Sequence, residues 1–342
     1  MKVSIIGASG YTGVELLRIL HNHPNVEILF LSSQTKEDIS IDKIYPHLLK
    51  VYENKFVSQQ KLLDAAEQTD VIFTALPHGH SLAIGKLLQA TKTKLIDLGA
   101  DYRFCDESIY EKWYKLEHTH KNSGAVFGLS ELNYEAIKNA KILANPGCYP
   151  TASILSLYPL IKADLIDVDT IIIDAASGTT GAGRQLRLSS HFSEVFENFT
   201  AYGVTNHRHT PEIEMFLASA FSKNITITFT PHLVPMARGI LTTAYAKIKN
   251  GVTLQNLNDA YKIYADKYFI RLIGQNSPAT KNTRGSNFVD IGWFLDERTN
   301  RVVALAALDN LVKGASGQAV QNMNIMFNFP QETGLNFSPV YP

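Results

Sequence analysis

The 342-residue chain has little cysteine and no excess of charge of either sign. Its two cysteines are too few for a disulfide framework or a four-thiolate zinc site, and they suit a reducing cytoplasm. Lys plus Arg and Asp plus Glu number 32 each, so no general field favours nucleic acid or an anionic membrane. With a hydrophobic fraction of 45%, the chain is typical of a globular protein of about two domains.

Long apolar runs, low-complexity linkers and internal repeats are also lacking. No run approaches the roughly 20 apolar residues of a membrane-spanning helix. Met1-Lys2 leads directly into the strand-like run 3–6, which is too short for a signal peptide. We therefore expect a cytoplasmic protein that binds a small-molecule substrate rather than nucleic acid or a membrane.

One cysteine lies in the motif Asn-Pro-Gly-Cys-Tyr-Pro-Thr at residues 145–151, directly after the apolar run 142–144. Pro146-Gly147 predicts a tight bend, and Pro150 is expected to open a helix that runs to Leu160. Cys148 then lies at a strand-to-helix turn, where backbone N–H groups and the helix dipole lower the pKa of a thiol. A nucleophile and a buried structural thiol are both compatible with this turn. The other cysteine, Cys105, has no helix start or base beside it and is interpreted as structural.

The chain opens with a strand at 2–6, a glycine-rich turn at 7–13 and a helix that reaches Leu20. Such a turn lets backbone N–H groups approach a pyrophosphate, which then rests on the helix N-terminus. The spacing is Gly-x-x-Gly-x-x-Gly rather than Gly-x-Gly-x-x-Gly, and a glycine-rich turn without a ligand is the alternative. The predicted cofactor-binding residues here are Gly7, Ser9, Gly10, Tyr11, Thr12 and Gly13.

The residues after the second strand, expected at 26–31, indicate which cofactor is bound. An NAD site places an acidic side chain here to hold the ribose hydroxyls, but the first carboxylate is Glu37. Ser32, Ser33 and a lysine suit a 2′-phosphate instead, which favours NADP(H). The preference for NADP(H) would not hold if a nearby acidic side chain bound the ribose, or if this loop did not contact the ribose.

Two further loops follow strands of the same expected sheet. Pro77, His78 and Gly79 follow the strand at 70–76, where a doubly wound sheet binds ligands, and are predicted to shape the cofactor site. Arg103 follows the strand at 94–98 and suits a bidentate clamp on a carboxylate or phosphate, although a surface arginine in a solvated loop fits equally well.

In the second half of the chain, the strand at 168–176 leads into Ser-Gly-Thr-Thr-Gly-Ala-Gly-Arg at 177–184. Its small residues and arginine could wrap phosphate oxygens, or form a flexible loop without a ligand. The polar, poorly periodic stretch 186–206 is interpreted as a lid or a partner contact.

The motif His-Arg-His-Thr-Pro-Glu at 207–212 comes next, with Thr210 as the expected N-cap and Pro211 as the first residue of a helix. A histidine can deprotonate a thiol and protonate a product oxygen near neutral pH. His207 and His209, like His78 and His80, lack a third ligand nearby in the sequence, so no metal site is expected.

The remaining segments predict a mostly antiparallel sheet with one covered face, because apolar residues alternate along them. The expected strands are 225–230, 239–248, 287–295 and 301–308, with a helix at 254–268 and a last helix that ends at Phe327.

Five motifs, at 7–13, 145–151, 177–184, 207–212 and 309–315, together resemble the N-acetyl-gamma-glutamyl-phosphate reductases, and the resemblance covers essentially the whole chain. It implies that NADPH reduces an acyl phosphate to N-acetylglutamate semialdehyde, with release of phosphate, in arginine biosynthesis. It also implies an α/β fold: a Rossmann-type doubly wound parallel sheet (1–147 and 310–342) interrupted by a catalytic and dimerisation domain (148–309) of mostly antiparallel sheet. Homodimers or homotetramers are usual in the family. Its wider relatives are aspartate-semialdehyde and glyceraldehyde-phosphate dehydrogenases.

The resemblance also implies roles for residues. Cys148 would attack the acyl phosphate to form a thioester, and one of the two histidines would be the acid and base. His207 is favoured, with His209 and Glu212 orienting it or the substrate. In aspartate-semialdehyde dehydrogenases the histidine comes from a strand of the sheet, but the comparable strand here carries Ile240. Predicted substrate-binding residues are Arg103, Asn145, Ser177, Gly178, Arg184 and Arg208; Gly178 and Asn310 are also assigned to the cofactor, Asn310 to the nicotinamide amide.

Two other functions remain open at this stage. Another semialdehyde dehydrogenase of the same fold would share every step except the choice of substrate. A non-enzymatic NADP-sensing protein would keep the glycine-rich turn but has no need for Cys148 and paired histidines.

Overall fold

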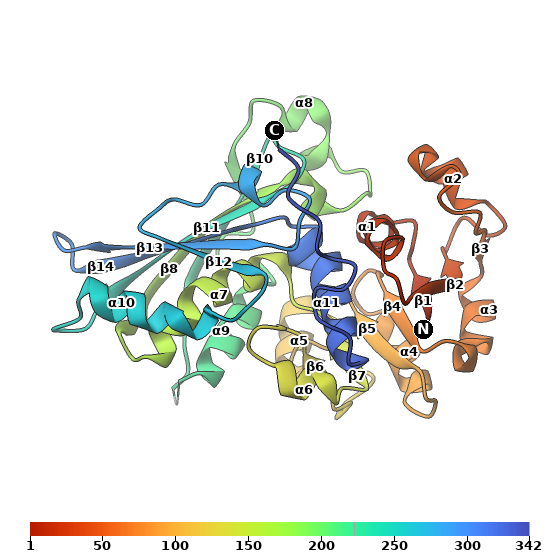
Figure 1. Cartoon of the computed structure of the whole chain (residues 1–342), viewed down its shortest axis with the longest axis horizontal. Helices are drawn as coiled ribbons and strands as arrows, with labels where there is room; N and C mark the ends of the chain where they lie inside the picture. Colours follow the sequence, from red (N-terminus) through yellow and green to blue (C-terminus); the bar gives the residue numbers. More distant parts are fainter. Residues whose placement is uncertain (222, 342) are drawn as a thin grey trace. The chain divides into compact units, whose positions relative to one another are not determined.

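The computed structural model describes residues 1–221 and 223–341, and the chain divides into two compact units (Figure 1). The first unit comprises Met1–Pro146 and Ala315–Asn336, and the second comprises Gly147–Gly314 and Phe337–Pro342. The predicted boundaries at 147/148 and 309/310 differ from these. Residues 309–314 remain with the second unit because Asp309 and Asn310 hydrogen-bond to Gly285 and Gly239 of that unit.

The first unit contains a parallel sheet of seven strands in the order β3-β2-β1-β4-β5-β7-β6. The order reverses between β1 and β4, which is the topological switch point where doubly wound sheets bind ligands. This confirms the predicted Rossmann-type sheet. The strands are β1 (Lys2–Ile6), β2 (Glu27–Ser32), β3 (Phe56–Val57), β4 (Val71–Thr74), β5 (Lys94–Asp97), β6 (Val126–Phe127) and β7 (Ile142–Ala144).

Helices follow most of these strands, as right-handed crossover connections require. Strand β4 is buried along its whole length, as expected for a parallel sheet that is covered on both faces. The helices are α1 (Tyr11–Leu20), α2 (Ile41–Ile44), α3 (Gln59–Asp64), α4 (Ser81–Leu88), α5 (Glu107–Tyr114), α6 (Tyr134–Lys138) and α11 (Gly317–Met326).

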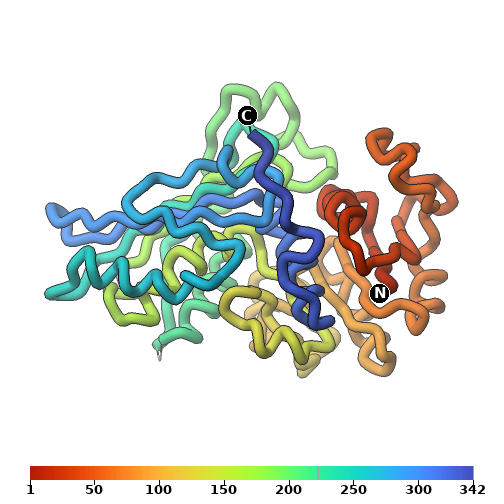
Figure 2. Tube along the Cα trace, viewed as in Figure 1, coloured from red at the N-terminus to blue at the C-terminus, as the bar shows by residue number. Residues whose placement is uncertain are grey.

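Helix α11 belongs to the first unit although it comes near the end of the sequence (Figure 2). All of its residues are buried, and its polar side chains bond to the first unit rather than to solvent. Gln318 and Asn322 both donate to the carbonyl of Gly128, and Lys94 donates to the carbonyl of Met326. Buried amides with such partners explain why a helix with no polar face is stable here.

The second unit contains a mixed sheet of seven strands in the order β12-β13-β14-β11-β8-β10-β9. The pairs β12/β13 and β8/β10 are parallel and the other pairs are antiparallel, so the predicted mostly antiparallel sheet is confirmed. The strands are β8 (Ile166–Gly178), β9 (Thr200–Ala201), β10 (Thr228–Val234), β11 (Ile240–Ile248), β12 (Ile270–Gly274), β13 (Val289–Asp296) and β14 (Arg301–Leu308).

Helix α7 lies at the centre of the second unit, packed against β11, β14 and α9. It is buried on nearly all sides. Tyr261 of α10 packs against one side of α7, where its hydroxyl donates to the Ser156 carbonyl at 2.7 Å. The Tyr261 ring also stacks on that of Trp293, with ring centroids 4.0 Å apart. The helices are α7 (Cys148–Lys162), α8 (Phe192–Val195), α9 (Thr210–Ser219) and α10 (Leu254–Tyr261), and a π-helical turn spans Val312–Ser316.

Several predicted boundaries are wrong. Helix α7 begins at Cys148 rather than Pro150, since the missing N–H of proline is harmless anywhere in the first turn. The helix predicted to reach residue 268 ends as an α-helix at Tyr261, after which the chain forms β12, a strand that was not predicted. The strand expected at 225–230 spans 228–234 because it pairs with β8.

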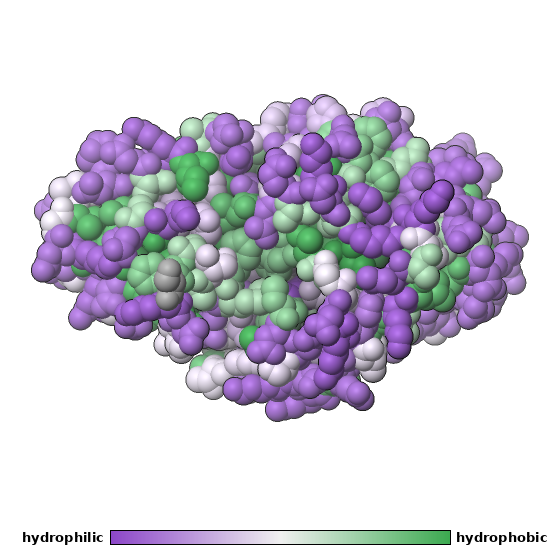
Figure 3. Space-filling model, turned by 90° about the horizontal axis from the view of Figure 1, so that it is seen from below, coloured by the Kyte–Doolittle hydropathy of each residue, from purple (hydrophilic) through white to green (hydrophobic). Residues whose placement is uncertain are grey.

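Hydrophilic residues cover much of the face in Figure 3, with hydrophobic patches between them. Among the described residues, no helix combines the length and the apolar character needed to cross a membrane.

The first unit contains a buried carboxyl whose charge opposes folding. Asp97, the last residue of β5, is fully buried and accepts hydrogen bonds from the hydroxyls of Thr74 and Ser81, both at 2.7 Å. Burial, and then the charge of nearby Asp101, raises the pKa of this carboxyl to about 6. The folded state therefore binds the proton more tightly than the unfolded chain does. Its stabilising contribution is complete below about pH 4 and is lost as the pH rises through about 6.

We expect Asp97→Asn to remove this pH dependence, because asparagine keeps an acceptor oxygen but has no charge. Between about pH 4 and pH 6, the free energy of unfolding of the wild type should fall relative to that of the variant, by up to about 3 kcal/mol. Urea unfolding followed by circular dichroism across this range measures the difference. Asp64→Asn, at an exposed carboxyl of α3, is the control. Parallel profiles for the wild type and Asp97→Asn would contradict the role of Asp97.

Candidate active site

Cys148 is the first residue of α7, and Gly147 is the N-cap. Gly147 has no side chain that could cap this end of the helix, and the first turn of α7 itself contains no acidic residue. The first N–H groups of a helix lack partners within the helix and carry partial positive charge, which stabilises a thiolate. The position of Cys148 thus fits a nucleophile better than a structural thiol.

Two glycines allow close approach to this turn. A Cβ on Gly147 would lie 2.6 Å from Nε2 of His209, so the imidazole lies directly against the residue before the cysteine. A Cβ on Gly314, in the π-helical turn, would lie 2.7 Å from the Cβ of Cys148. Neither contact leaves space for a side chain. A side chain at either position would therefore displace His209 or Cys148.

Glu212, in the first turn of α9, connects the histidine motif to the cysteine turn. Its side chain is fully buried, and Oε1 accepts a hydrogen bond from the Gly147 N–H at 2.8 Å. The expected N-cap of α9 is off by one residue, because His209 is the N-cap and Thr210 already lies in the helix. Glu212 thus contacts the backbone of the residue directly before Cys148.

The two histidines contact each other. The backbone N–H of His209 donates to Nδ1 of His207 at 3.2 Å, and the ring centroids are 4.9 Å apart. A neutral His207 therefore carries its proton on Nε2. Burial, with a smaller effect from the charge of Arg208, lowers the pKa of His207 to about 4, so this ring is neutral at pH 7.

Tyr149 is a site residue that sequence reasoning missed. Its ring packs edge-on against both His207 and His209, with centroids 5.6 and 5.9 Å away. Its hydroxyl lies 3.1 Å from that of Tyr202 and 3.2 Å from the carbonyl of His232. Burial raises the pKa of Tyr149, and it raises the pKa of Tyr202 to about 12, so both hydroxyls keep their protons. Only its place next to Cys148 could have drawn attention to Tyr149.

Four N–H groups of the glycine-rich loop after β8 are bonded within the protein. The N–H groups of Gly178, Thr179, Thr180 and Gly183 donate to carbonyls of the protein itself, so they are not turned toward a ligand. Ser177 is buried, and its hydroxyl donates to the Gly178 carbonyl. The substrate-binding roles of Ser177 and Gly178 stay predictions, as does the second, cofactor-binding role of Gly178.

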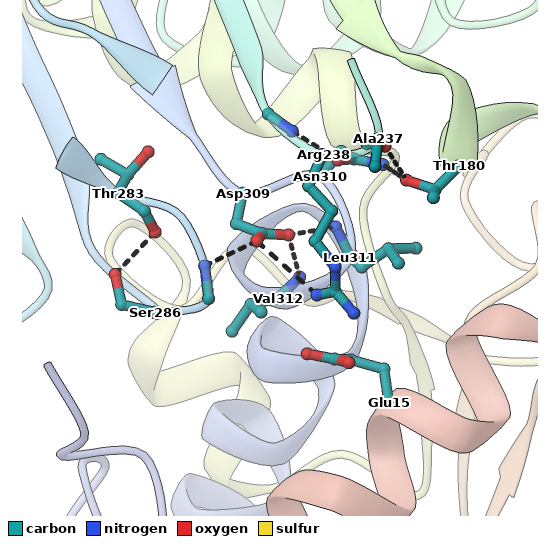
Figure 4. A network of polar contacts seen from close by, with 12 residues as sticks. Glu15, Thr180, Ala237, Arg238, Thr283, Ser286, Asp309, Asn310, Leu311 and Val312 are labelled. Carbon is teal, nitrogen blue, oxygen red and sulfur yellow. Dashed lines mark hydrogen bonds and ion pairs between the residues drawn. The ribbon is translucent and has the colours of Figure 1, made fainter. Parts of the chain in front are cut away.

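Asn310 belongs to a network of polar contacts next to this loop (Figure 4). Its Oδ1 accepts from the Gly239 N–H at 2.8 Å, and its Nδ2 donates to the Thr180 hydroxyl at 2.9 Å. The neighbouring Asp309 accepts from the N–H groups of Gly285, Leu311 and Val312, and its carboxylate lies 3.6 Å from the Arg238 guanidinium. These bonds hold the start of the π-helical turn in place. The predicted contact of Asn310 with a nicotinamide is not tested by them.

Arg184 and Arg208 of the second unit are both exposed. In the first unit, by contrast, Arg103 is only 5% exposed, so the alternative of a solvated surface arginine is wrong. Its guanidinium donates to the carbonyls of Asn145 and Leu98. The side chain of Asn145 in turn donates to the carbonyl of Ala315. These contacts support the strand ends, and binding of substrate by these four residues stays a prediction.

The glycine-rich turn of the first unit has the geometry of a nucleotide-binding loop. Gly7 has a φ of +85°, and a Cβ there would lie 2.4 Å from the Ala75 carbonyl oxygen. A Cβ on Gly13 would lie 2.6 Å from the Gly7 carbonyl oxygen. Gly10 is different, because its φ is −86° and the nearest atom to a Cβ would be 3.6 Å away. The packing of the chain therefore does not require a glycine at position 10. The open space next to Gly10 would allow a ligand to approach the backbone.

The start of α1 supports the same interpretation. The N-cap of this helix is Gly10, which has no side chain to occupy the first N–H groups at Tyr11, Thr12 and Gly13, and such groups at a helix start suit an anion. The Ser32 carbonyl accepts from the N–H groups of Gly7 and Ala8 and so shapes the loop. The hydroxyls of Ser9 and Ser33 lie 2.8 Å apart, at the ends of β1 and β2.

The loop after β4 is held by a residue that the sequence did not reveal. Asp101 accepts from the N–H groups of Gly79 and Ser81 at 2.7 and 2.9 Å, and from the Tyr110 hydroxyl. Gly79 has a φ of +87°, which this bend requires. His78, after Pro77, packs edge-on against Tyr114 with centroids 4.8 Å apart. Within residues 1–221 and 223–341, no three His, Cys, Asp or Glu side chains gather as they would around a metal ion.

Comparison with known proteins gives the family. Residues 2–140 match the NAD binding domain of semialdehyde dehydrogenases, and residues 148–310 match their dimerisation domain. The N-acetyl-gamma-glutamyl-phosphate reductase of Desulforamulus reducens is 48% identical, with all of both chains covered. This chain belongs to the N-acetyl-gamma-glutamyl-phosphate reductase family. The enzyme of the same name from Campylobacter jejuni is 49% identical over 98% of each chain. The predicted family resemblance is thereby confirmed.

Solved structures agree with the fold of an N-acetyl-gamma-glutamyl-phosphate reductase family member. Aspartate semialdehyde dehydrogenase II from Vibrio cholerae has a TM-score of 0.73 at 16% identity, with 96% of this chain and 98% of that chain covered. The aspartate semialdehyde dehydrogenase with NADP from Candida albicans has a TM-score of 0.70 at 15% identity, over 95% of this chain and 98% of the other. At these identities, the likeness establishes the fold alone.

A substitution at Gly314 tests whether its close approach to Cys148 positions the cysteine. We expect Gly314→Ala to displace the cysteine, because the new Cβ would lie 2.7 Å from that of Cys148. A displacement of this kind costs about 100-fold in turnover. The measurement combines turnover with the rate of alkylation of Cys148 in a Cys105→Ser background, which removes the exposed second thiol. Unchanged turnover and unchanged alkylation would show that the turn does not depend on this contact.

Proposed function

We propose that this protein catalyses the NADPH-dependent reduction of N-acetyl-gamma-glutamyl phosphate to N-acetylglutamate semialdehyde and phosphate, a step of arginine biosynthesis. Relatives named for this activity match the whole chain at 47–49% identity. The observation that carries the mechanism is the position of Cys148 as the first residue of α7, directly after a glycine against which Nε2 of His209 packs.

The Cys148 thiolate attacks the acyl carbon of the substrate, the bond from that carbon to the phosphate oxygen breaks, and phosphate leaves. The product of this step is a thioester on Cys148. When bound, the reduced cofactor supplies a hydride to the thioester carbon. The resulting hemithioacetal collapses with breakage of the C–S bond, which releases the aldehyde and restores the thiolate. The partial positive charge at the start of α7 stabilises the thiolate at the beginning and at the end of this cycle.

Sequence reasoning favoured His207 as the acid and base, but the contacts support His209. Nε2 of His209 approaches the residue before Cys148, whereas Nδ1 of His207 accepts from the His209 N–H. With a pKa near 4, His207 is also a weak base at neutral pH. We propose that His209 takes the proton from the Cys148 thiol, donates it to the oxygen of the hemithioacetal, and takes it back as the aldehyde forms. His207 and Tyr149 orient the His209 ring, and Glu212 holds the turn beneath it.

This assignment predicts unequal effects of the two histidine variants. His209→Asn should lower kcat/KM at least 100-fold, as expected for the loss of general acid–base catalysis. His207→Asn keeps a polar side chain beside the His209 N–H, so it should cost about 10-fold or less. In a plot of kcat/KM against pH, the sloping limb that reports titration of the acid–base group should disappear in His209→Asn only. A larger loss in His207→Asn, with loss of the limb there, would return the role to His207.

The residues of the first unit fit a nicotinamide dinucleotide. The open space above Gly10 and the first N–H groups of α1, at Tyr11 to Gly13, would hold a pyrophosphate. The hydroxyls of Ser9 and Ser33, with Lys36 nearby in the sequence, would hold a 2′-phosphate, so we propose NADP(H) rather than NAD(H). The loop at Pro77 to Gly79, with Ser32, would complete the site. Gly178 and Asn310 stay proposals for the nicotinamide end.

Assembly and location follow from the same proposal. The match of residues 148–310 to a dimerisation domain supports association with further copies, and we propose a homodimer or homotetramer. The two thiols, with no disulfide, suit the reducing cytoplasm, where NADPH is available.

The proposed reaction can be tested in reverse with N-acetylglutamate semialdehyde, phosphate and NADP, by following absorbance of the reduced cofactor. We expect phosphate-dependent reduction by the wild type and by Cys105→Ser, and a loss of at least 1,000-fold in Cys148→Ser, because a hydroxyl is a much weaker nucleophile than a thiolate. Turnover with aspartate semialdehyde alone would keep the mechanism but change the substrate. No turnover with either aldehyde, together with tight NADP binding, would indicate a sensor.

A further inference from the structure

Helix α11 carries buried amide side chains that the proposed mechanism does not use. Gln318, Gln321, Asn322 and Asn324 all lie on this helix, and none of them has any exposed surface. Burying an amide costs free energy unless it is hydrogen-bonded, and a helix that only had to pack would carry apolar side chains at these positions. The partners of these amides therefore indicate what the helix does besides packing.

Asn322 is the centre of a hydrogen-bonded chain that starts at the residues after β6. Its Oδ1 accepts from the Ser130 hydroxyl at 2.6 Å, and its Nδ2 donates to the Gly128 carbonyl at 2.7 Å and to Oδ1 of Asn145 at 3.2 Å. Gln318 donates to the same carbonyl and to the Ser130 hydroxyl at 2.6 Å. A Cβ on Gly128 would lie 2.6 Å from Nδ2 of Asn322, so the amide packs directly on this backbone. Because Oδ1 and Nδ2 of Asn322 have different partners, the amide is held in one orientation.

The chain ends at Asn145, which is fully buried and bonded on every side. Its backbone N–H donates to the Asp97 carbonyl at 2.8 Å, and its backbone carbonyl accepts from Arg103 at 2.9 Å. Its Nδ2 donates to the Ala315 carbonyl at 3.0 Å. Only two residues separate Asn145 from Cys148 in the sequence. These bonds fit a fixed support for the cysteine turn better than the predicted contact with substrate.

We infer that Asn322 is a positioning residue for the nucleophile: through Asn145 it fixes the start of the turn that carries Cys148. The inference rests on the proposed function, in which Cys148 attacks the substrate. Pro146 follows Asn145 and has a fixed φ, so the orientation of Asn145 is passed on along the chain toward the cysteine. A displacement of about 1 Å at a reacting group costs about 100-fold in rate, so a support of this kind matters for turnover.

A pair of matched variants on α11 tests the inference, both in a Cys105→Ser background. Asn322→Leu removes the amide that reaches Asn145. Gln321→Leu is the control, because it also removes a fully buried amide from α11, but one that donates to Glu131 and Gln331 instead. We expect Asn322→Leu to lower kcat by about 10- to 100-fold with little change in KM, and Gln321→Leu to stay within about 2-fold of the background protein.

The rate at which iodoacetamide alkylates Cys148 gives a readout that does not need substrate. We expect this rate to fall about 10-fold in Asn322→Leu, because a displaced thiolate loses stabilisation by the first N–H groups of α7. Unfolding would instead expose the thiol and speed its alkylation, so loss of stability alone does not produce this result.

Ser130→Ala is a milder change that tests the same chain if Asn322→Leu does not fold. It frees one side of the Asn322 amide, so kcat and the alkylation rate should both fall, by less than in Asn322→Leu. Combining the two changes should lower kcat no further than Asn322→Leu does, because residues that act through one network are not additive. Thermal unfolding of each variant shows that it is folded at the assay temperature.

Three results would overturn the inference. The first is an unchanged kcat and alkylation rate in Asn322→Leu and Ser130→Ala, with only the unfolding temperature lowered. The second is a rise in KM with unchanged alkylation, which would favour direct contact of Asn145 with substrate. The third is an equal loss in Gln321→Leu, which would indicate general weakening of α11. A wild type that does not turn over the proposed substrate would contradict the proposed function, whereas the alkylation rates would still decide the role of Asn322.

Discussion

The hydrogen bond from the Gly147 N–H to the buried Glu212 carboxylate is the interaction on which the candidate active site depends. It joins the first turn of α7, which carries Cys148, to the first turn of α9, which follows the two histidines. A buried carboxylate without a partner is costly, so the bond is strongly favoured once α9 packs against α7. The histidine motif and the cysteine turn are thereby held together, although 65 residues separate the two partners of this bond.

Buried carboxylates also accept hydrogen bonds from backbone N–H groups at two other loops. Asp101 accepts from the N–H groups of Gly79 and Ser81, and Asp309 accepts from those of Gly285, Leu311 and Val312. In each case a buried carboxylate binds backbone donors of a loop at a strand end or a helix start. Such loops lack the regular hydrogen bonds of helices and sheets, so their N–H groups need other partners. Carboxylates provide these partners and keep the loops in one conformation.

The site also needs space, and glycine provides it. Gly147 and Gly314 let His209 and the π-helical turn approach Cys148, and Gly7 and Gly13 let the nucleotide-binding loop fold tightly against β4 and itself. At these positions a methyl group would overlap a neighbouring atom. At Gly10 it would not, which separates a glycine kept free for a ligand from glycines that the packing requires. This distinction cannot be made from spacing in a sequence.

The pairing of a cysteine with a histidine motif was implied by the family resemblance. The sequence by itself determined the class of both sheets and the nucleotide-binding turn. These follow from local rules, because periodic apolar residues, glycines and prolines act over a few positions. The tertiary structure alone decided that Tyr149 packs on both histidines, that His209 rather than His207 approaches the cysteine turn, and that Asp101 and Glu212 hold the loops. It also showed that the loop after β8 uses its N–H groups internally and that the polar stretch at 186–206 exposes large apolar side chains. Each of these depends on side chains and backbone groups that are far apart in the chain, and such contacts exist only once the two sheets have formed.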